Sequence, residues 1–176
     1  MSRRPVTVYA GSAIAAIVAV AVAGWIGGYR INFTPSYPLG LWRIEALGRD
    51  AVVGDLVFVC PPPTLQFTIA FERGYIRRGL CPGRFSPLIK TVVATEGQSI
   101  DIGDHVSVDG RLLAKSEVRR SDAEGRALTA WRGGAVPPGH LYLHSDFAGS
   151  YDSRYFGPIP AGGLLGLAVP VLTVDP

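Results

Sequence analysis

The 176-residue sequence contains only two cysteines and three histidines, and its charged fraction is low at 18%. Cys60 and Cys81 lack the Cys-x-x-Cys spacing of common zinc and redox motifs. His140 and His144 are four residues apart, but they fall in a predicted strand without a His-Glu-x-x-His motif, and His105 stands alone. The sequence therefore predicts no metal site and no cofactor.

Runs of like charge are also missing. The 17 Lys and Arg residues exceed the 14 Asp and Glu residues only slightly, and they are scattered along the chain. Pairs such as Arg77-Arg78 and Arg119-Arg120 are typical of solvated surface rather than of a nucleic-acid patch. No internal repeat or low-complexity tract is present, so we expect no nucleic-acid partner.

Charge is absent altogether between Arg4 and Arg30, and Val6 to Gly28 is almost wholly apolar or small. As a helix rising about 1.5 Å per residue, this run is long enough for a bilayer core of roughly 30 Å. A cleaved signal peptide is the competing interpretation, because Ala21-Val22-Ala23 is a small-x-small pattern. The run is longer than a typical signal core, which favours a membrane anchor.

Arg3 and Arg4 precede the run, so the short N-terminus should stay cytoplasmic. We therefore expect residues 1–29 to be a cytoplasmic N-terminus and a single transmembrane helix in the lipid bilayer of the inner membrane. Residues 30–176 would then form one periplasmic domain.

The predicted domain is mainly β, because 14 prolines and 22 glycines punctuate short runs rich in β-branched residues. Residues 52–59 indicate a turn and a strand, and Asp109-Gly110 suits the tight turn of a hairpin. The remaining expected elements are strands at 88–94, 140–144 and 164–174, a loop or small excursion from Cys60 to Cys81, and a loop or insertion at 114–134.

Cys60 and Cys81 leave two alternatives. In an oxidising compartment they could close a loop of roughly 20 residues, contributing about 3 kcal/mol in the chain-entropy model. Otherwise they remain two free thiols.

Lys90 is a lysine within an apolar strand, where alternation places it on one face with Leu88, Val92 and Ala94. Burial would lower its pKa and make the neutral amine a proton acceptor. The alternative is an edge position from which the amine reaches solvent.

Ser36 lies between Pro35 and Pro38, which discourage helix and present its hydroxyl on a rigid turn. An ordinary turn serine is the alternative. Asp152 and Arg154 are two residues apart, so on an extended segment they would share a side and pair, or else form a surface ion pair in a polar loop.

Three segments taken together, in this order behind an N-terminal apolar run, resemble the motifs of the S26 family of signal peptidases. They are Thr34-Pro-Ser-Tyr-Pro-Leu-Gly-Leu-Trp42, Ser86-Pro-Leu-Ile-Lys-Thr-Val-Val-Ala-Thr-Glu-Gly97 and Ser150-Tyr-Asp-Ser-Arg-Tyr-Phe-Gly157. The resemblance covers nearly the whole chain. It implies a signal-peptidase-like β domain and a serine endopeptidase that acts on a protein substrate at the membrane surface.

The subtype resembles the TraF branch of that family, the conjugative-transfer peptidases that mature pilin precursors. Tyr37 follows the serine where housekeeping enzymes usually carry Met, and Ser145-Asp146-Phe147 stands where they usually carry Gly-Asp-Asn. The short chain and the cysteine pair agree with this branch. Cyclisation of the pilin product is a further expectation from the resemblance.

The resemblance also implies roles. Ser36 would be the nucleophile and Lys90 its general base. The backbone N–H of Ser36 and the Thr34 hydroxyl would bind the oxyanion, Ser150 would orient the lysine, and Asp152 and Arg154 would support the site.

Two other functions remain open. One is a general leader peptidase that acts on many secreted precursors. The other is a catalytically inactive, membrane-tethered β module in a secretion or conjugation assembly, which would not depend on Ser36 or Lys90.

Overall fold

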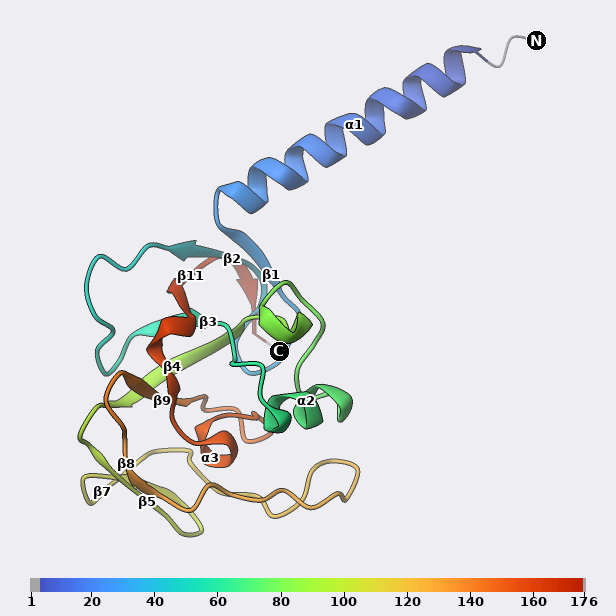
Figure 1. The fold of residues 1–176 in the computed structure, drawn as a ribbon. Helices are drawn as coiled ribbons and strands as arrows, with labels where there is room; N and C mark the ends of the chain where they lie inside the picture. Colours follow the sequence, from blue (N-terminus) through green and yellow to red (C-terminus); the bar gives the residue numbers. More distant parts are fainter. Residues whose placement is uncertain (1–3, 176) are drawn as a thin grey trace.

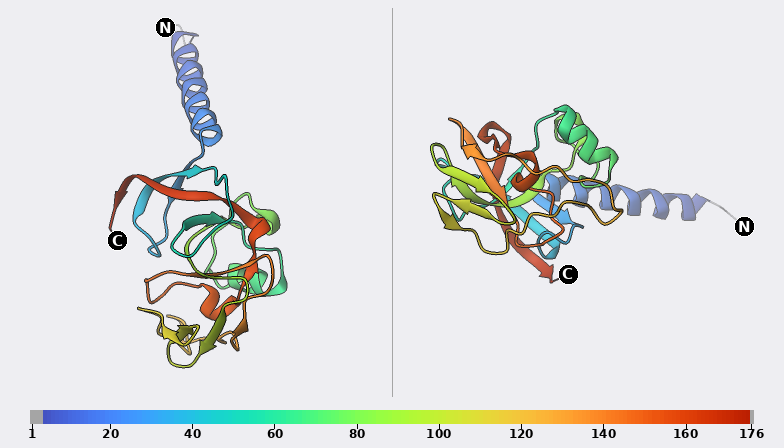
Figure 2. Two further views of the ribbon diagram at one scale, coloured as in Figure 1. Left: turned by 90° about the vertical axis from the view of Figure 1, so that its left-hand side faces the viewer. Right: turned by 90° about the horizontal axis from the view of Figure 1, so that it is seen from below.

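The computed structural model describes residues 4–175 (Figure 1). Helix α1 (Arg4–Ile26) covers most of the predicted uncharged run. It extends away from a β-rich domain in all the views of Figures 1 and 2. Across residues 4–175 no helix has both the length and the apolar character required to cross a membrane. Arg3, one of the two residues used to predict the orientation of an anchor, lies outside the described residues.

A seven-stranded antiparallel sheet forms most of the domain, in the spatial order β1-β2-β11-β3-β4-β9-β10. Its strands are β1 (Tyr29–Asn32), β2 (Leu39–Glu45), β3 (Leu56–Val59), β4 (Leu88–Thr95), β9 (His140–His144), β10 (Ile159–Pro160) and β11 (Leu164–Val174). The mainly β fold and the strands predicted within 52–59, 88–94, 140–144 and 164–174 are confirmed. The C-terminal strand β11 lies inside the sheet, between β2 and β3.

The close approach of β11 to β2 explains why residue 40 is a glycine. Gly40 lies opposite Thr173 with a φ of +125°. A Cβ at this position would overlap the carbonyl oxygen of Leu172. Only glycine therefore fits here.

A smaller four-stranded sheet, in the order β7-β6-β5-β8, packs below the first. It consists of β5 (Ser99–Ile102), β6 (Val106–Val108), β7 (Arg111–Leu112) and β8 (Gly134–Ala135). The predicted hairpin is present, with φ of 50° at Asp109 and 75° at Gly110. Between Leu113 and Gly133 the chain is a loop with a single bridge, from Ser121 to Ala127.

The helical segments after α1 were not predicted. They are α2 (Leu65–Glu72), α3 (Ser153–Phe156) and two short 3-10 turns, η1 (Pro82–Arg84) and η2 (Ala161–Gly163). The expectation that Asp152 to Arg154 is an extended segment was wrong. Asp152 is instead the N-cap of α3, where its side chain accepts the backbone N–H of Arg154.

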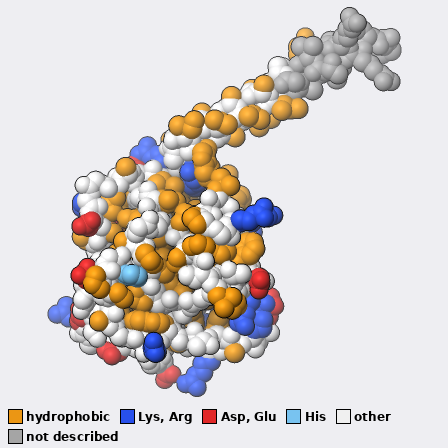
Figure 3. Space-filling model, viewed as in Figure 1, with side chains coloured by type: hydrophobic (Ala, Val, Ile, Leu, Met, Phe, Trp, Pro, Cys, Tyr) orange, Lys and Arg blue, Asp and Glu red, His pale blue; other side chains and the backbone are white. Residues whose placement is uncertain are grey.

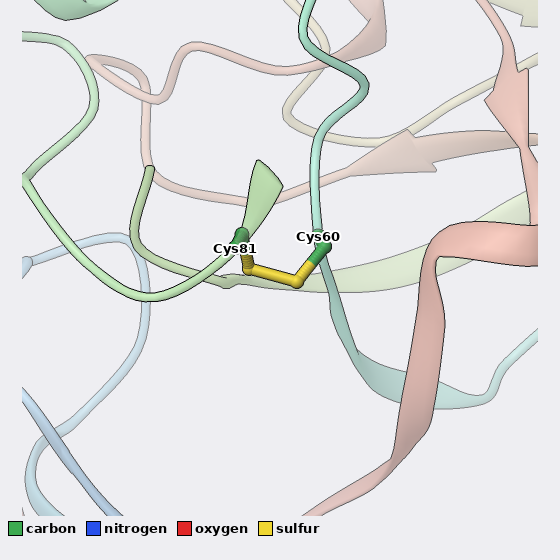
Figure 4. The surroundings of a disulfide bond; sticks show 2 residues. All are labelled: Cys60 and Cys81. Atoms are coloured by element: carbon green, nitrogen blue, oxygen red, sulfur yellow. A yellow bond between two sulfur atoms is a disulfide. The ribbon is translucent and has the colours of Figure 1, made fainter. Parts of the chain in front are cut away.

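Cys60 and Cys81 are joined by a disulfide with their Cα atoms 5.5 Å apart (Figure 4). The bond closes the segment that contains α2. Phe67 and Ala70 of α2 are buried in the main hydrophobic core, to which Val57 and Val59 of β3 also belong. The disulfide and this packing together fix a segment that borders the candidate site.

Candidate active site

Three side chains from distant parts of the chain meet at one point of the seven-stranded sheet. Ser36 lies in the turn between β1 and β2, Lys90 lies in β4, and Ser150 lies in the loop after β9. Lys90 Nζ donates a hydrogen bond of 2.8 Å to Ser150 Oγ, and Ser36 Oγ lies 3.5 Å from the same atom. Ser150 therefore connects the Ser36 hydroxyl to the Lys90 amine.

Lys90 is buried, with an exposed fraction of 3%. Strand β4 is paired on both sides, by β3 and β9, so Lys90 does not occupy a sheet edge and its amine does not reach solvent. Burial lowers the pKa of Lys90 to about 8, while the carboxylate of Asp152 opposes this shift and the Arg154 guanidinium adds to it. A substantial fraction of the amine is thus neutral near pH 8 and available as a proton acceptor.

Asn32, which the sequence did not single out, organises the turn that carries Ser36. Its Oδ1 accepts hydrogen bonds from the backbone N–H and the hydroxyl of Thr34, at 3.1 and 2.7 Å. Its Nδ2 donates to the carbonyls of Thr34, Tyr37 and Pro38 at 2.9 to 3.0 Å. One buried side chain thus fixes both ends of the turn around Ser36.

The two predicted oxyanion donors differ in whether they already form a hydrogen bond. Among the described residues, no acceptor lies within hydrogen-bonding distance of the backbone N–H of Ser36, so this donor is free. The Thr34 hydroxyl donates to Asn32. The hydroxyl of Thr34 must therefore rotate its proton away from Asn32 before it can donate a hydrogen bond to an oxyanion.

The Ser36 turn is also anchored to β9 and the loop that follows. Ser145 Oγ donates to the carbonyl oxygen of Ser36 at 2.7 Å. The Tyr37 hydroxyl lies 2.7 Å from Thr91 Oγ1 and donates to the carbonyl of His144 at 3.2 Å. Burial raises the pKa of Tyr37, which keeps its hydroxyl protonated. These contacts hold Ser36 against β4, where Lys90 lies.

Asp152 and Arg154 form a fully buried ion pair behind Ser150. Asp152 accepts two hydrogen bonds of 2.8 Å from the guanidinium. Arg154 also donates to the carbonyls of Ser150, Phe147 and Glu117, at 3.3, 3.3 and 2.8 Å. The pair therefore fixes the loop that presents Ser150, which argues against the alternative of a surface ion pair.

Although its burial acts in the opposite direction, the neighbouring His144 ring and the hydrogen bonds from Arg154 lower the pKa of Asp152 to about 2. The carboxylate is thus charged at any pH at which the amine of Lys90 is partly neutral. Its field favours the protonated form of Lys90 and limits how far burial depresses that pKa.

His144 is a second feature that the sequence did not reveal. It is 2% exposed, and its Nδ1 lies 3.5 Å from Asp152 Oδ2 without forming a hydrogen bond. Its Nε2 lies 3.9 Å from Asp146 Oδ1. Across the described residues, no group of three or more His, Cys, Asp and Glu side chains is arranged to hold a metal ion.

Ser36 and Lys90 are among the residues that line a cleft of about 260 Å³. Its walls come from the Ser36 turn, from β4, from the segment after α2 and from the loop that contains Gly149 and Tyr151. The two proposed catalytic side chains thus border a cavity of the size of a few amino-acid side chains.

Comparison with known proteins agrees with this geometry. The family model described as signal peptidase, peptidase S26, matches residues 5–173. The chain is 57% identical over 176 residues to the conjugal transfer protein TraF of Agrobacterium fabrum, with all of both chains covered. It is 36% identical over 179 residues to the plasmid transfer protein TraF of Escherichia coli, with 98% of this chain and 99% of that protein covered.

Among solved structures, the chain is similar to a signal peptidase I from Enterococcus faecalis, with 16% identity and a TM-score of 0.41. That match covers 68% of this chain and 97% of the other. The family model and the TraF relatives span the Ser36, Lys90 and Ser150 segments alike. The chain therefore belongs to the signal peptidase family, peptidase S26.

Proposed function

We propose that this chain is a membrane-bound serine endopeptidase that matures a conjugative pilin subunit, with Ser36 as nucleophile and Lys90 as general base. One observation carries the proposal. The buried amine of Lys90, whose pKa is lowered to about 8, is connected to the Ser36 hydroxyl through Ser150. Burying an amine is costly, so a lysine without a chemical role would be expected to keep its amine in solvent.

The chemistry follows the serine–lysine form of acyl transfer. Neutral Lys90 takes the proton of Ser36 Oγ, directly or through the Ser150 hydroxyl, and Ser36 Oγ bonds to the scissile carbonyl carbon. The carbonyl oxygen becomes an oxyanion bound by the free backbone N–H of Ser36, with Thr34 as a second donor after its hydroxyl rotates. Protonated Lys90 then gives its proton to the leaving amine as the peptide bond breaks.

The acyl-enzyme is resolved by a second nucleophile. Lys90, neutral again, removes a proton from a water molecule or from the substrate's own amino terminus as it attacks the acyl carbon. Water gives a linear product, and the amino terminus gives a cyclic one. The second route is the proposed cyclisation.

A membrane anchor is part of the proposal, with α1 as a single span, a cytoplasmic N-terminus and the catalytic domain on the periplasmic side. Several large apolar side chains of α1 are exposed: Tyr9, Ile14, Ile17, Val18, Val20, Val22, Trp25 and Ile26. The orange side chains along the projecting helix are visible in Figure 3. Large apolar side chains exposed together on one helix are unfavourable in water and favour a lipid environment.

The conjugative substrate is proposed from the relatives, which are named conjugal transfer and plasmid transfer proteins. A protein substrate suits the open cleft, and a membrane-inserted precursor suits a Ser36 that follows α1 by only ten residues.

The test is processing of a co-expressed pilin-type precursor by wild type, Ser36→Ala and Lys90→Ala, measured by intact mass. Trimming by the wild type alone supports the serine–lysine assignment, and a product lighter by one further water shows cyclisation. A Ser107→Ala variant, altered in the smaller sheet, is the matched control and should process normally.

Other outcomes separate the alternatives. Equal behaviour of all variants on a precursor that is processed would mean that the chain is an inactive tethered module. Cleavage of many unrelated secreted precursors would instead favour a general leader peptidase.

A further inference from the structure

The cleft at Ser36 borders a second hollow, which shares no lining residue with the groove beside α1. The cleft and this hollow share Gly74, Tyr75, Gly149 and Tyr151 as a common border. The second hollow has a volume of about 250 Å³, and of the side chains used in the proposed chemistry only Ser150 lines it. We call it the arginine–tyrosine pocket, after Arg73, Tyr75, Arg119, Tyr151 and Tyr155, which line it together with Asp122, Glu124 and Arg126.

Three tyrosine rings give this pocket a rigid aromatic wall. The rings of Tyr75 and Tyr151 lie 5.0 Å apart, and those of Tyr151 and Tyr155 are stacked at 5.8 Å with planes 3° from parallel. Hydrogen bonds fix two of the rings, because Tyr75 donates to Asp122 and the Tyr155 hydroxyl accepts the backbone N–H of Arg119. A preformed wall of this kind binds a substrate group with little loss of entropy.

The charges around the pocket do not cancel. Arg126 is paired with both acidic residues, at 2.6 Å to Asp122 and 3.0 Å to Glu124. Among the described residues, neither Arg73 nor Arg119 has a carboxylate within 4.0 Å. Arg73 is held in place by a hydrogen bond of 2.9 Å to the carbonyl of Ala127. Two guanidinium groups are therefore available to an anionic ligand.

The opposite end of the cleft has a different character. There the cleft shares Thr34, Arg77, Ser86, Pro87 and Ile89 with a larger apolar groove between the domain and α1. A peptide that lies across Ser36 thus meets an apolar surface at one end and a cationic, aromatic pocket at the other.

We propose that the arginine–tyrosine pocket is a subsite that binds a carboxylate of the substrate, on the side of the scissile bond away from α1. This inference rests on the proposed peptidase function and names a feature of its substrate. An extended chain advances about 3.3 Å per residue, so a pocket bordered by Gly149 and Tyr151 receives a group only a few residues from the scissile bond. Arg73 and Arg119 are specificity-determining residues for that group.

The test uses the full-length protein in detergent micelles and peptides that span the cleavage site of the processed pilin precursor. A single Glu, or Gln as its neutral isostere, is placed in turn at each of three positions on both sides of the scissile bond. We expect one position at which Glu raises kcat/KM about tenfold over Gln, which corresponds to one good charge-assisted contact. The advantage should decrease with salt.

The variants Arg73→Gln and Arg119→Gln should each reduce the Glu-to-Gln ratio, and the double variant should bring it close to one. Arg132→Gln removes an exposed arginine outside the pocket and should leave the ratio as in the wild type. Equal cleavage of Glu and Gln peptides at every position, or a ratio that survives in the double variant, would overturn the proposal.

Binding of the same peptides to Ser36→Ala separates this proposal from the proposed function. Tighter binding of the Glu peptide, lost in the Arg73→Gln and Arg119→Gln double variant, supports the subsite even if wild type cuts none of the peptides. Cleavage without any carboxylate preference in either assay leaves the peptidase and removes the subsite.

Discussion

The hydroxyl of Ser150 accepts a hydrogen bond of 2.8 Å from Lys90, and this is the only hydrogen bond of the Lys90 amine among the described residues. Replacement by Ser150→Ala should lower kcat about 10²-fold, because the base is no longer oriented. KM should change little, since Ser150 is buried. The midpoint of the pH profile should also move to lower pH, because the ammonium loses its acceptor. Initial rates from pH 6 to 10 measure both effects, and a wild-type profile in Ser150→Ala would contradict the assignment.

The pH dependence of cleavage should report Lys90. Its pKa is lowered to about 8 by burial, and the base acts only when neutral. We expect kcat/KM to rise about tenfold per pH unit below that value and to level off above it. Lys90→Arg should be inactive at every pH, since arginine stays charged. A profile without an inflection between pH 7 and 9 would exclude Lys90 as the titrating base.

The same burial predicts an effect on stability. The folded pKa of Lys90 lies at about 8 and the ordinary value is 10.5, so between these values the unfolded chain binds more protons than the folded one. The free energy of unfolding should therefore rise with pH across this window, by about 3 kcal/mol in total. Lys90→Met should lose the rise, and urea unfolding at pH 7.5 and 10 compares the two proteins. Parallel pH dependence in both would show that Lys90 is not perturbed.

Asn32 should affect catalysis without touching the substrate's reacting atoms. Asn32→Asp keeps the two bonds that Oδ1 accepts but replaces the Nδ2 donor with an oxygen that faces the carbonyls of Thr34, Tyr37 and Pro38. The turn around Ser36 should open, lowering kcat by about 10²-fold, as small misplacements of reacting groups do. Measuring kcat together with the melting temperature distinguishes a local opening of the turn from global unfolding. Full activity in Asn32→Asp would mean that the turn holds its shape without these bonds.

The disulfide should matter for both stability and cleavage. Cys60 and Cys81 are 21 residues apart, and a loop of this length corresponds to about 3 kcal/mol in the chain-entropy model. A Cys60→Ala and Cys81→Ala double variant should unfold at lower denaturant concentration, and dithiothreitol should then have no further effect. Peptide cleavage should also weaken, because Gly74 to Arg77, inside the closed loop, line the cleft. An unchanged unfolding midpoint would show that core packing alone fixes this segment.

Strands with strong local patterns could be predicted from the sequence, and elements held by distant contacts could not. Residues 88–94 are rich in β-branched side chains, and Asp109-Gly110 has the composition of a tight turn, so β4 and the β6–β7 hairpin were predicted correctly. Helix α2 has no strong amphipathic pattern, and it depends on burial of Phe67 and Ala70 in the main hydrophobic core. Helix α3 has only four residues and is stabilised by its Asp152 cap.

The site residues divide in the same way. The segments around Ser36, Lys90 and Ser150 carry recognisable motifs, and the structure brings these three residues together. Asn32 and His144 could not be identified, because an isolated asparagine or histidine has no local pattern that reveals which turn or carboxylate it will face. Their contacts exist only after β1, β9 and the loops beside them are assembled.

The position of β11 has a consequence for how the candidate site is held together. Among the described residues, the β1–β2 hairpin, which carries Ser36, pairs with the rest of the seven-stranded sheet through β11 alone. Lys90 and the loop of Ser150 belong to the part of the sheet on the other side of β11. Without that strand, the Ser36 turn would be tied to β4 and β9 only by side-chain contacts such as those of Tyr37 and Ser145. The backbone pairing of β11 therefore makes the two halves of the candidate site one continuous sheet.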